Sequence, residues 1–87
     1  MTTYLAHINV MLRLLVNDPQ GLAVRDGLHA LGFEHTSSVR VGKRIEVTLD
    51  AATHSGAEEQ VAQMCDRLLA NAVIEDYEFT VSELVGA

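Results

Sequence analysis

The chain has 87 residues, 48% of them hydrophobic, so a single domain over residues 1–87 with a small core is expected. Six Lys and Arg against twelve Asp and Glu give a formal net charge of −6, which disfavours nucleic acid and anionic membranes as partners. The single cysteine, Cys65, excludes an internal disulfide and fits a reducing, cytoplasmic compartment. A core this thin also favours self-association, as a homodimer or a higher oligomer.

The first predicted element is a strand. From residue 4 to residue 16 every even position is apolar, the period of two that a strand with one buried face shows. The odd positions are mixed, and Leu5, Met11 and Leu15 suggest that part of the second face is also covered. Polar residues such as His7 and Arg13 interrupt the run, so neither a signal peptide nor a transmembrane helix is expected here.

The motif Asp18-Pro19-Gln20-Gly21 predicts the start of the first helix. An aspartate side chain accepts hydrogen bonds from free backbone N–H groups, and proline suits the first helical position. The apolar positions that follow at helical spacing are Val24, Leu28 and Leu31. This helix is expected to end at about Gly32 in a left-handed cap.

Two more strands are predicted over residues 39–41 and 45–49, joined by a hairpin at Gly42-Lys43. The capping-box pattern Ser55-Gly56-Ala57-Glu58 then opens a second helix, which Asn71 is expected to stop in the left-handed conformation. The apolar positions of this helix are Ala57, Val61, Met64, Cys65 and Leu68.

A last strand follows, in which Tyr77, Phe79 and Val81 alternate with polar residues. The predicted order is therefore βαββαβ. This order is typical of an α+β, ferredoxin-like sandwich with an antiparallel sheet and both helices on one face.

Candidate sites for chemistry are few. The four histidines lie on different predicted elements, so no metal site and no catalytic residue is predicted, and Cys65 is interpreted as a buried, unreactive thiol. Three of the six cations, Arg40, Lys43 and Arg44, fall within five residues. They indicate either a contact site for an acidic partner or an anionic ligand, or ordinary solubilising charge on a turn.

Five motifs together resemble one known family, PurS, the small subunit of bacterial and archaeal phosphoribosylformylglycinamidine synthase. They are Asp18-Pro19-Gln20-Gly21, Leu31-Gly32-Phe33, Val39-Arg40-Val41-Gly42-Lys43, Met64-Cys65-Asp66-Arg67-Leu68-Leu69-Ala70-Asn71 and Ile74-Glu75-Asp76-Tyr77. Two departures touch turns: Leu14-Leu15 stands where the family usually has Pro-Gly, and Ala72 where proline is common.

The resemblance implies a non-catalytic assembly subunit in purine biosynthesis. It would bridge a PurQ-type glutaminase and a PurL-type synthetase and assist ammonia transfer, holding no cofactor itself while the complex uses ATP with Mg²⁺. The residues expected at interfaces are Arg40, Gly42, Lys43, Glu75, Asp76 and Tyr77. Residues of the structural motifs are Asp18, Pro19, Gln20, Gly21, Gly32, Asn71 and Ile74.

A second hypothesis comes from the fold alone. A βαββαβ domain also suits a stand-alone regulatory module of the ACT type, which binds a small metabolite at a dimer interface. Binding of an amino acid or nucleotide by the isolated protein would favour this alternative.

Overall fold

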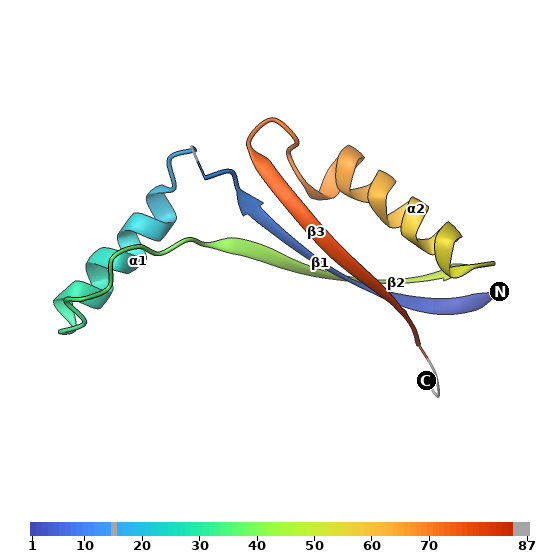
Figure 1. Cartoon of the computed structure of the whole chain (residues 1–87), viewed down its shortest axis with the longest axis horizontal. Coiled ribbons are helices and arrows are strands. Elements are labelled where there is room, and N and C mark those ends of the chain that lie inside the picture. Colours follow the sequence, from blue (N-terminus) through green and yellow to red (C-terminus); the bar gives the residue numbers. More distant parts are fainter. Residues whose placement is uncertain (15, 85–87) are drawn as a thin grey trace.

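The computed structural model describes residues 1–14 and 16–84. Its elements in chain order are β1 (Thr2–Leu12), α1 (Pro19–Ala30), β2 (Gly42–Ala51), α2 (His54–Met64), the π-helical turn η1 (Cys65–Leu69) and β3 (Glu75–Glu83). The three strands form one antiparallel sheet in the order β2-β1-β3, so β1 lies in the middle (Figure 1). The α+β class with an antiparallel sheet is confirmed.

The core lies between the sheet and α2. On β1 the even positions from Tyr4 to Val10 are buried, as the alternation predicts. Ala6, Ile8 and Val10 form one core cluster with Val61 and Cys65, and Tyr4 belongs to a second cluster with Ala57. The inward residues of β3, Tyr77, Phe79 and Val81, pack against the same core. The prediction that β1 continues to residue 16 was wrong, because pairing with both neighbours ends by Leu12, and Leu15 lies outside the described residues.

The predicted hairpin at Gly42-Lys43 is not found. Residues 39–41 form no strand, and β2 runs without a turn from Gly42 to Ala51, so the described part of the chain has three strands where four were expected. Gly42 has a different role here. A Cβ at this position would overlap the Met11 side chain and the Val10 carbonyl oxygen, so glycine permits close approach of β2 to β1.

Helix α1 does not lie on the sheet, although both helices were expected on one face. It projects from the end of the sheet as an arm, while α2 alone covers the sheet (Figure 1). The radius of gyration is 16.9 Å, well above the roughly 12 Å of a compact chain of this length. Leu31 is 76% and Phe33 58% exposed. Among the described residues, most of the apolar stripe of α1 is therefore exposed.

The caps of α1 agree with the sequence. The Asp18 side chain accepts from Gly21 N at 2.8 Å, and Pro19 is the first helical residue. At the other end Gly32 has φ +101°, and Phe33 N donates to Leu28 O, which completes a Schellman motif.

The predicted caps of α2 were both wrong. Thr53 takes the place expected for Ser55, because its hydroxyl accepts from Gly56 N at 3.0 Å. Asn71 is not left-handed: α2 passes into η1, and Ala70 ends the helical segment in an extended conformation.

Candidate functional site

A pocket of about 320 Å³ lies where the three strands meet the start of α1. It is lined by Val10, Leu12, Asp18, Pro19, Gln20, Val41, Gly42, Lys43 and Glu75. Seven of these, all but Val10 and Leu12, belong to three of the motifs that the sequence singled out. The fold thus brings the start of α1, the start of β2 and the start of β3 to one place, which we call the junction pocket.

Asp18 connects the two chain segments that enter and leave the arm. One carboxylate oxygen accepts from Gly21 N at 2.8 Å, and the other accepts from Val41 N at 3.2 Å. These backbone hydrogen bonds, with a smaller contribution from the Arg40 charge, lower the pKa of Asp18 below its ordinary value. The side chain therefore stays ionised and holds α1 against the start of β2.

Arg40 and Lys43 strengthen the same junction. The Arg40 guanidinium donates to the carbonyl oxygen of Leu12, at the end of β1. Lys43 Nζ lies 3.8 Å from a carboxylate oxygen of Glu75, whose side chain is mostly buried. Two predicted interface groups, one on β2 and one on β3, are therefore in direct contact with each other across the end of β1.

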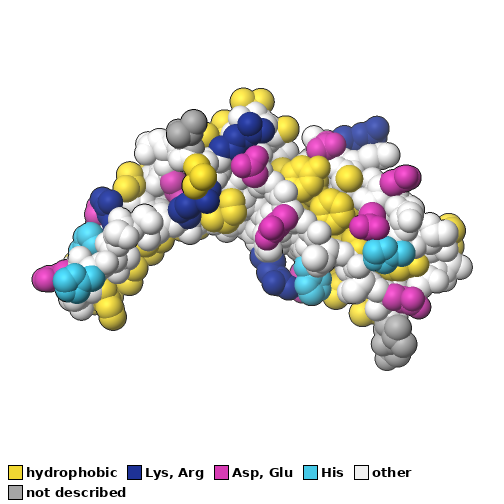
Figure 2. All heavy atoms as spheres, in the orientation of Figure 1, with side chains coloured by type: hydrophobic (Ala, Val, Ile, Leu, Met, Phe, Trp, Pro, Cys, Tyr) yellow, Lys and Arg dark blue, Asp and Glu magenta, His cyan; other side chains and the backbone are white. Residues whose placement is uncertain are grey.

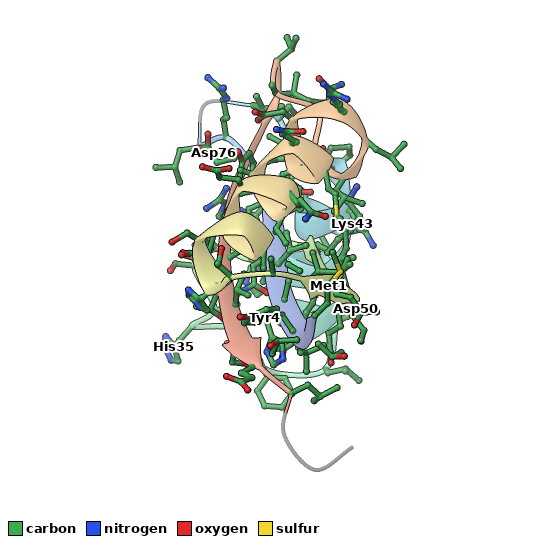
Figure 3. The ribbon with its side chains drawn as sticks, turned by 90° about the vertical axis from the view of Figure 1, so that its right-hand side faces the viewer. Met1, Tyr4, His35, Lys43, Asp50 and Asp76 are labelled. Carbon is green, nitrogen blue, oxygen red and sulfur yellow. The ribbon has the colours of Figure 1, made fainter. Side chains whose placement is uncertain are left out.

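The other predicted interface residues face different ways. Asp76 pairs with Met11 on the uncovered face of the sheet, and its carboxylate lies 3.5 Å from Arg13 Nε. Figure 3 shows Asp76 and Lys43 toward opposite edges of the sheet, on β3 and β2 respectively. Tyr77 points to the helix side, where its hydroxyl donates to Asp66 and thereby has its pKa raised.

The predicted cluster of three cations is dispersed. Lys43 and Arg44 are neighbours on a strand, so they point to opposite faces. Arg44 Nη2 donates to His7 Nδ1 at 2.8 Å on the uncovered face, away from the junction pocket. Gly32 lies at the far end of the arm and contributes to the helix cap alone.

The charged groups of the junction pocket are already engaged. Asp18 is bound to backbone amides and Lys43 is next to Glu75, so neither pairs a nucleophile with a base. Cys65 lies in the core, where burial, and secondarily the Asp66 charge, raise the pKa of its thiol. Within residues 1–14 and 16–84 there is no cluster of three metal-ligating side chains. The arrangement suits a structural joint.

Comparison with known families decides the assignment. The sequence model of the family PurS, described as phosphoribosylformylglycinamidine (FGAM) synthase, matches residues 5–83. The chain belongs to the PurS family. Curated PurS subunits of this synthase include one from Synechocystis, 49% identical over 98% of this chain and 85% of the relative. Another, from Bacillus subtilis, is 40% identical over 95% of this chain and 98% of the relative.

Solved PurS structures have the same fold. The Bacillus subtilis PurS crystal structure superimposes with a TM-score of 0.83 at 40% identity, covering 92% of this chain and 99% of that one. The chain also matches a chain in a structure of PurLQS from Thermotoga maritima. The TM-score is 0.84 at 33% identity, over 97% of this chain and 100% of that one. These matches do not support the alternative of a stand-alone ACT-like module.

Sequence reasoning missed two features of this PurS chain. In the sequence Arg13 was noted only as a polar residue in the first apolar run. In the structure it joins the end of β1 to the turn before β3, because its backbone N–H donates to Ile74 O and its side chain donates to Ala72 O. The π-helical turn η1 was also missed, because residues 65–69 continue the helical spacing of α2 and carry no glycine or proline. No helix in the part of the chain that is described has both the length and the apolar character to span a membrane.

Proposed function

We propose that this protein is a non-catalytic assembly subunit of phosphoribosylformylglycinamidine synthase. It bridges a PurQ-type glutaminase and a PurL-type synthetase in the cytoplasm and assists ammonia transfer between them. The observation that carries the proposal is the match to PurS over residues 5–83 together with the likeness to the PurLQS structure. This subunit holds no cofactor, and the ATP and Mg²⁺ of the reaction bind elsewhere in the complex.

Bridging by a protein without its own active site has a clear physical basis. Ammonia is mostly protonated at neutral pH and is then no longer a nucleophile, so it has to pass between subunits in an assembly closed to water. The charged groups of the junction pocket bind one another or backbone amides and so hold α1, β2 and β3 in fixed positions. This agrees with a structural role.

The arm also supports a homodimer or higher oligomer. Leu31 and Phe33 are among the most exposed large apolar side chains described, and α1 packs against no strand of its own sheet. Covering this stripe with a second copy of the chain removes that apolar surface from water. Light scattering should show that a Leu31→Glu, Phe33→Glu double variant has a smaller mass than the wild type, with α2 and the sheet still folded.

Reconstitution tests the proposal. The glutaminase and synthetase of the source organism, each purified, are mixed with glutamine and ATP, with and without this protein, and separated by size exclusion. A stable species that contains both enzymes only when this protein is present is the expected result. Glutaminase and ATPase assays on the isolated protein provide the control, and activity there would contradict the non-catalytic role.

A further inference from the structure

Helix α1 and the extended residues 36–41 form one unit that lies outside the sheet. Asp18 connects the two, because its carboxylate accepts from Gly21 N, in α1, and from Val41 N. At the far end, His29 Nε2 lies 2.7 Å from the carbonyl oxygen of Thr36. Figure 1 shows this unit projecting from the end of the sheet, and Figure 2 shows hydrophobic side chains exposed on it. We call residues 36–41 the linking segment.

The linking segment has the pattern of a strand but no strand beside it. Val39 and Val41 are partly buried, and Ser38 and Arg40 between and before them are exposed. The same odd-numbered alternation continues in β2, where the side chains packed against the core are Ile45, Val47 and Leu49. Within the described ranges, residues 36–41 pair with no other strand. The linking segment is therefore a strand without a sheet.

The sheet has the complementary deficit at β2. In the order β2-β1-β3, β2 pairs with β1 on one side, and its other edge is free in the part of the chain that the structure describes. An edge of ten residues presents unpaired N–H and C=O groups to another strand. The core-facing side chains of β2 are only partly buried, whereas those of β1 are buried. This side of the sheet has room for one more strand and one more helix.

A hairpin within one chain does not fill that room well. The two-residue loop at Gly42-Lys43 would pair Val41 with Arg44, and so would turn both valines of the linking segment to the polar face. A three-residue loop would restore the faces but requires a left-handed residue at Arg44, where glycine is favoured. In the structure no turn interrupts residues 36–51. An opened hairpin of this kind suits exchange of the same element between two copies.

We propose that two copies of this chain exchange α1 and the linking segment. The linking segment of each copy adds to the free edge of β2 in the other copy as an antiparallel fourth strand. Helix α1 is carried with it to the helix side of that sheet, where its apolar stripe covers the core-facing side chains of β2. Each copy donates one unit and receives one, so the contact is two-fold and closed. This inference rests on the homodimer of the proposed function and specifies its contacts.

The apolar side chains restrict the register of the exchanged strands. They share one face only if odd positions of one copy meet odd positions of the other. A two-fold axis at position 43 meets this condition. It places Val41 opposite Ile45 of the partner subunit, and Val39 opposite Val47 of the partner subunit. Apolar pairs of this kind directly opposite each other stabilise an antiparallel ladder.

The charges favour the same register. It places Arg40 opposite Glu46 of the partner subunit, and Glu46 has no cation within 4.0 Å among the described residues. The two copies of Lys43 meet at the axis, but each lies 3.8 Å from Glu75 of its own chain. An axis at position 42 would instead set Arg40 opposite Arg44 of the partner subunit, and like charges directly opposite destabilise the pair of strands.

Paired cysteines test the exchange in the isolated protein. In the proposed register Ser38 lies opposite Thr48 of the partner subunit, with Cα atoms about 4.5–5.5 Å apart, which a disulfide spans. Within one chain these two residues lie ten positions apart on an extended run, roughly 30 Å, so they cannot be joined. Both are exposed, and the native Cys65 is buried.

Mild oxidation of the Ser38→Cys, Thr48→Cys variant should therefore give a covalent dimer on a non-reducing gel. The matched control is Ser38→Cys, Ser82→Cys, because Ser82 is exposed on β3, at the opposite edge of the sheet. The control should give at least about tenfold less covalent dimer, since its thiols lie beyond disulfide distance. Circular dichroism establishes that both variants are folded.

Light scattering on the wild type separates this inference from the proposed function. A monomeric wild type would contradict the homodimer and the exchange together, and reconstitution with the two enzymes would still test the bridging role. A dimeric wild type, with no more covalent dimer from the Ser38→Cys, Thr48→Cys variant than from the control, would overturn the exchange alone. In that case the free edge of β2 is left for a strand of another protein.

Discussion

Substitution of Gly21 tests how closely the arm is held to the sheet. Alanine in place of glycine inside a helix normally stabilises it by about 1 kcal/mol. At Gly21, however, the new methyl group would overlap the carbonyl oxygen of Val39 and press on the Asp18 carboxylate. A backbone carbonyl cannot rotate away as a side chain does, so overpacking of this kind costs about 1–3 kcal/mol.

Gly27 is the matched control on the same helix, because a Cβ there meets no atom within 4 Å. Both variants gain the same helix propensity, so the difference between them isolates the steric cost. Urea unfolding followed by circular dichroism, at one low protein concentration, should place Gly21→Ala about 1–3 kcal/mol below Gly27→Ala. Equal stabilities would refute the close contact between α1 and Val39, in the segment that leads into β2.

Three further predictions follow from the core and the junction. Ile8→Ala should lower the free energy of unfolding by about 2–5 kcal/mol and Ile8→Val by only about 0.5–1.5 kcal/mol, because Ile8 is fully buried; urea midpoints check both. Because the pKa of Asp18 is lowered in the folded state, its contribution to stability is present above the ordinary aspartate pKa of about 3.9 and is lost as pH falls through the lower folded value. Asp18→Asn should flatten that part of the acid unfolding curve, and an unchanged curve would contradict the two backbone hydrogen bonds. Cys65 should resist a thiol reagent in the native protein and react rapidly in urea, since its side chain is inaccessible; rapid native labelling would contradict this burial.

Local patterns predicted the elements that depend on neighbouring residues. The alternation on β1 marks the buried side chains from Tyr4 to Val10, and the Asp18 cap and the Gly32 turn are found where the motifs place them. The same alternation continues past Leu12, where no strand remains to pair with, so it overestimates the length of β1. The alternation shows which side chains can be buried, but a strand ends where hydrogen bonding to its neighbouring strands ends.

Features that depend on distant segments could not be predicted. The stripe on α1 indicates an apolar face, but the pattern does not say whether the same chain or another covers it. Glycine at position 42 is typical of a turn. In the structure it is needed because Met11 and Val10 approach it closely, a contact between residues about thirty positions apart in the sequence. The junction pocket likewise joins motifs that are far apart in the chain, so the contact between Lys43 and Glu75 is visible only in the fold.

A bridging subunit of this kind should couple glutamine hydrolysis to synthesis. The most direct measurement is the rate of formylglycinamidine ribonucleotide formation by the two enzyme subunits, with this protein titrated in and with either glutamine or ammonia as nitrogen donor. The glutamine-driven rate should require this protein and saturate at a fixed ratio of subunits, while the ammonia-driven rate should change far less. A glutamine-driven rate that is the same without this protein would rule out the bridging role.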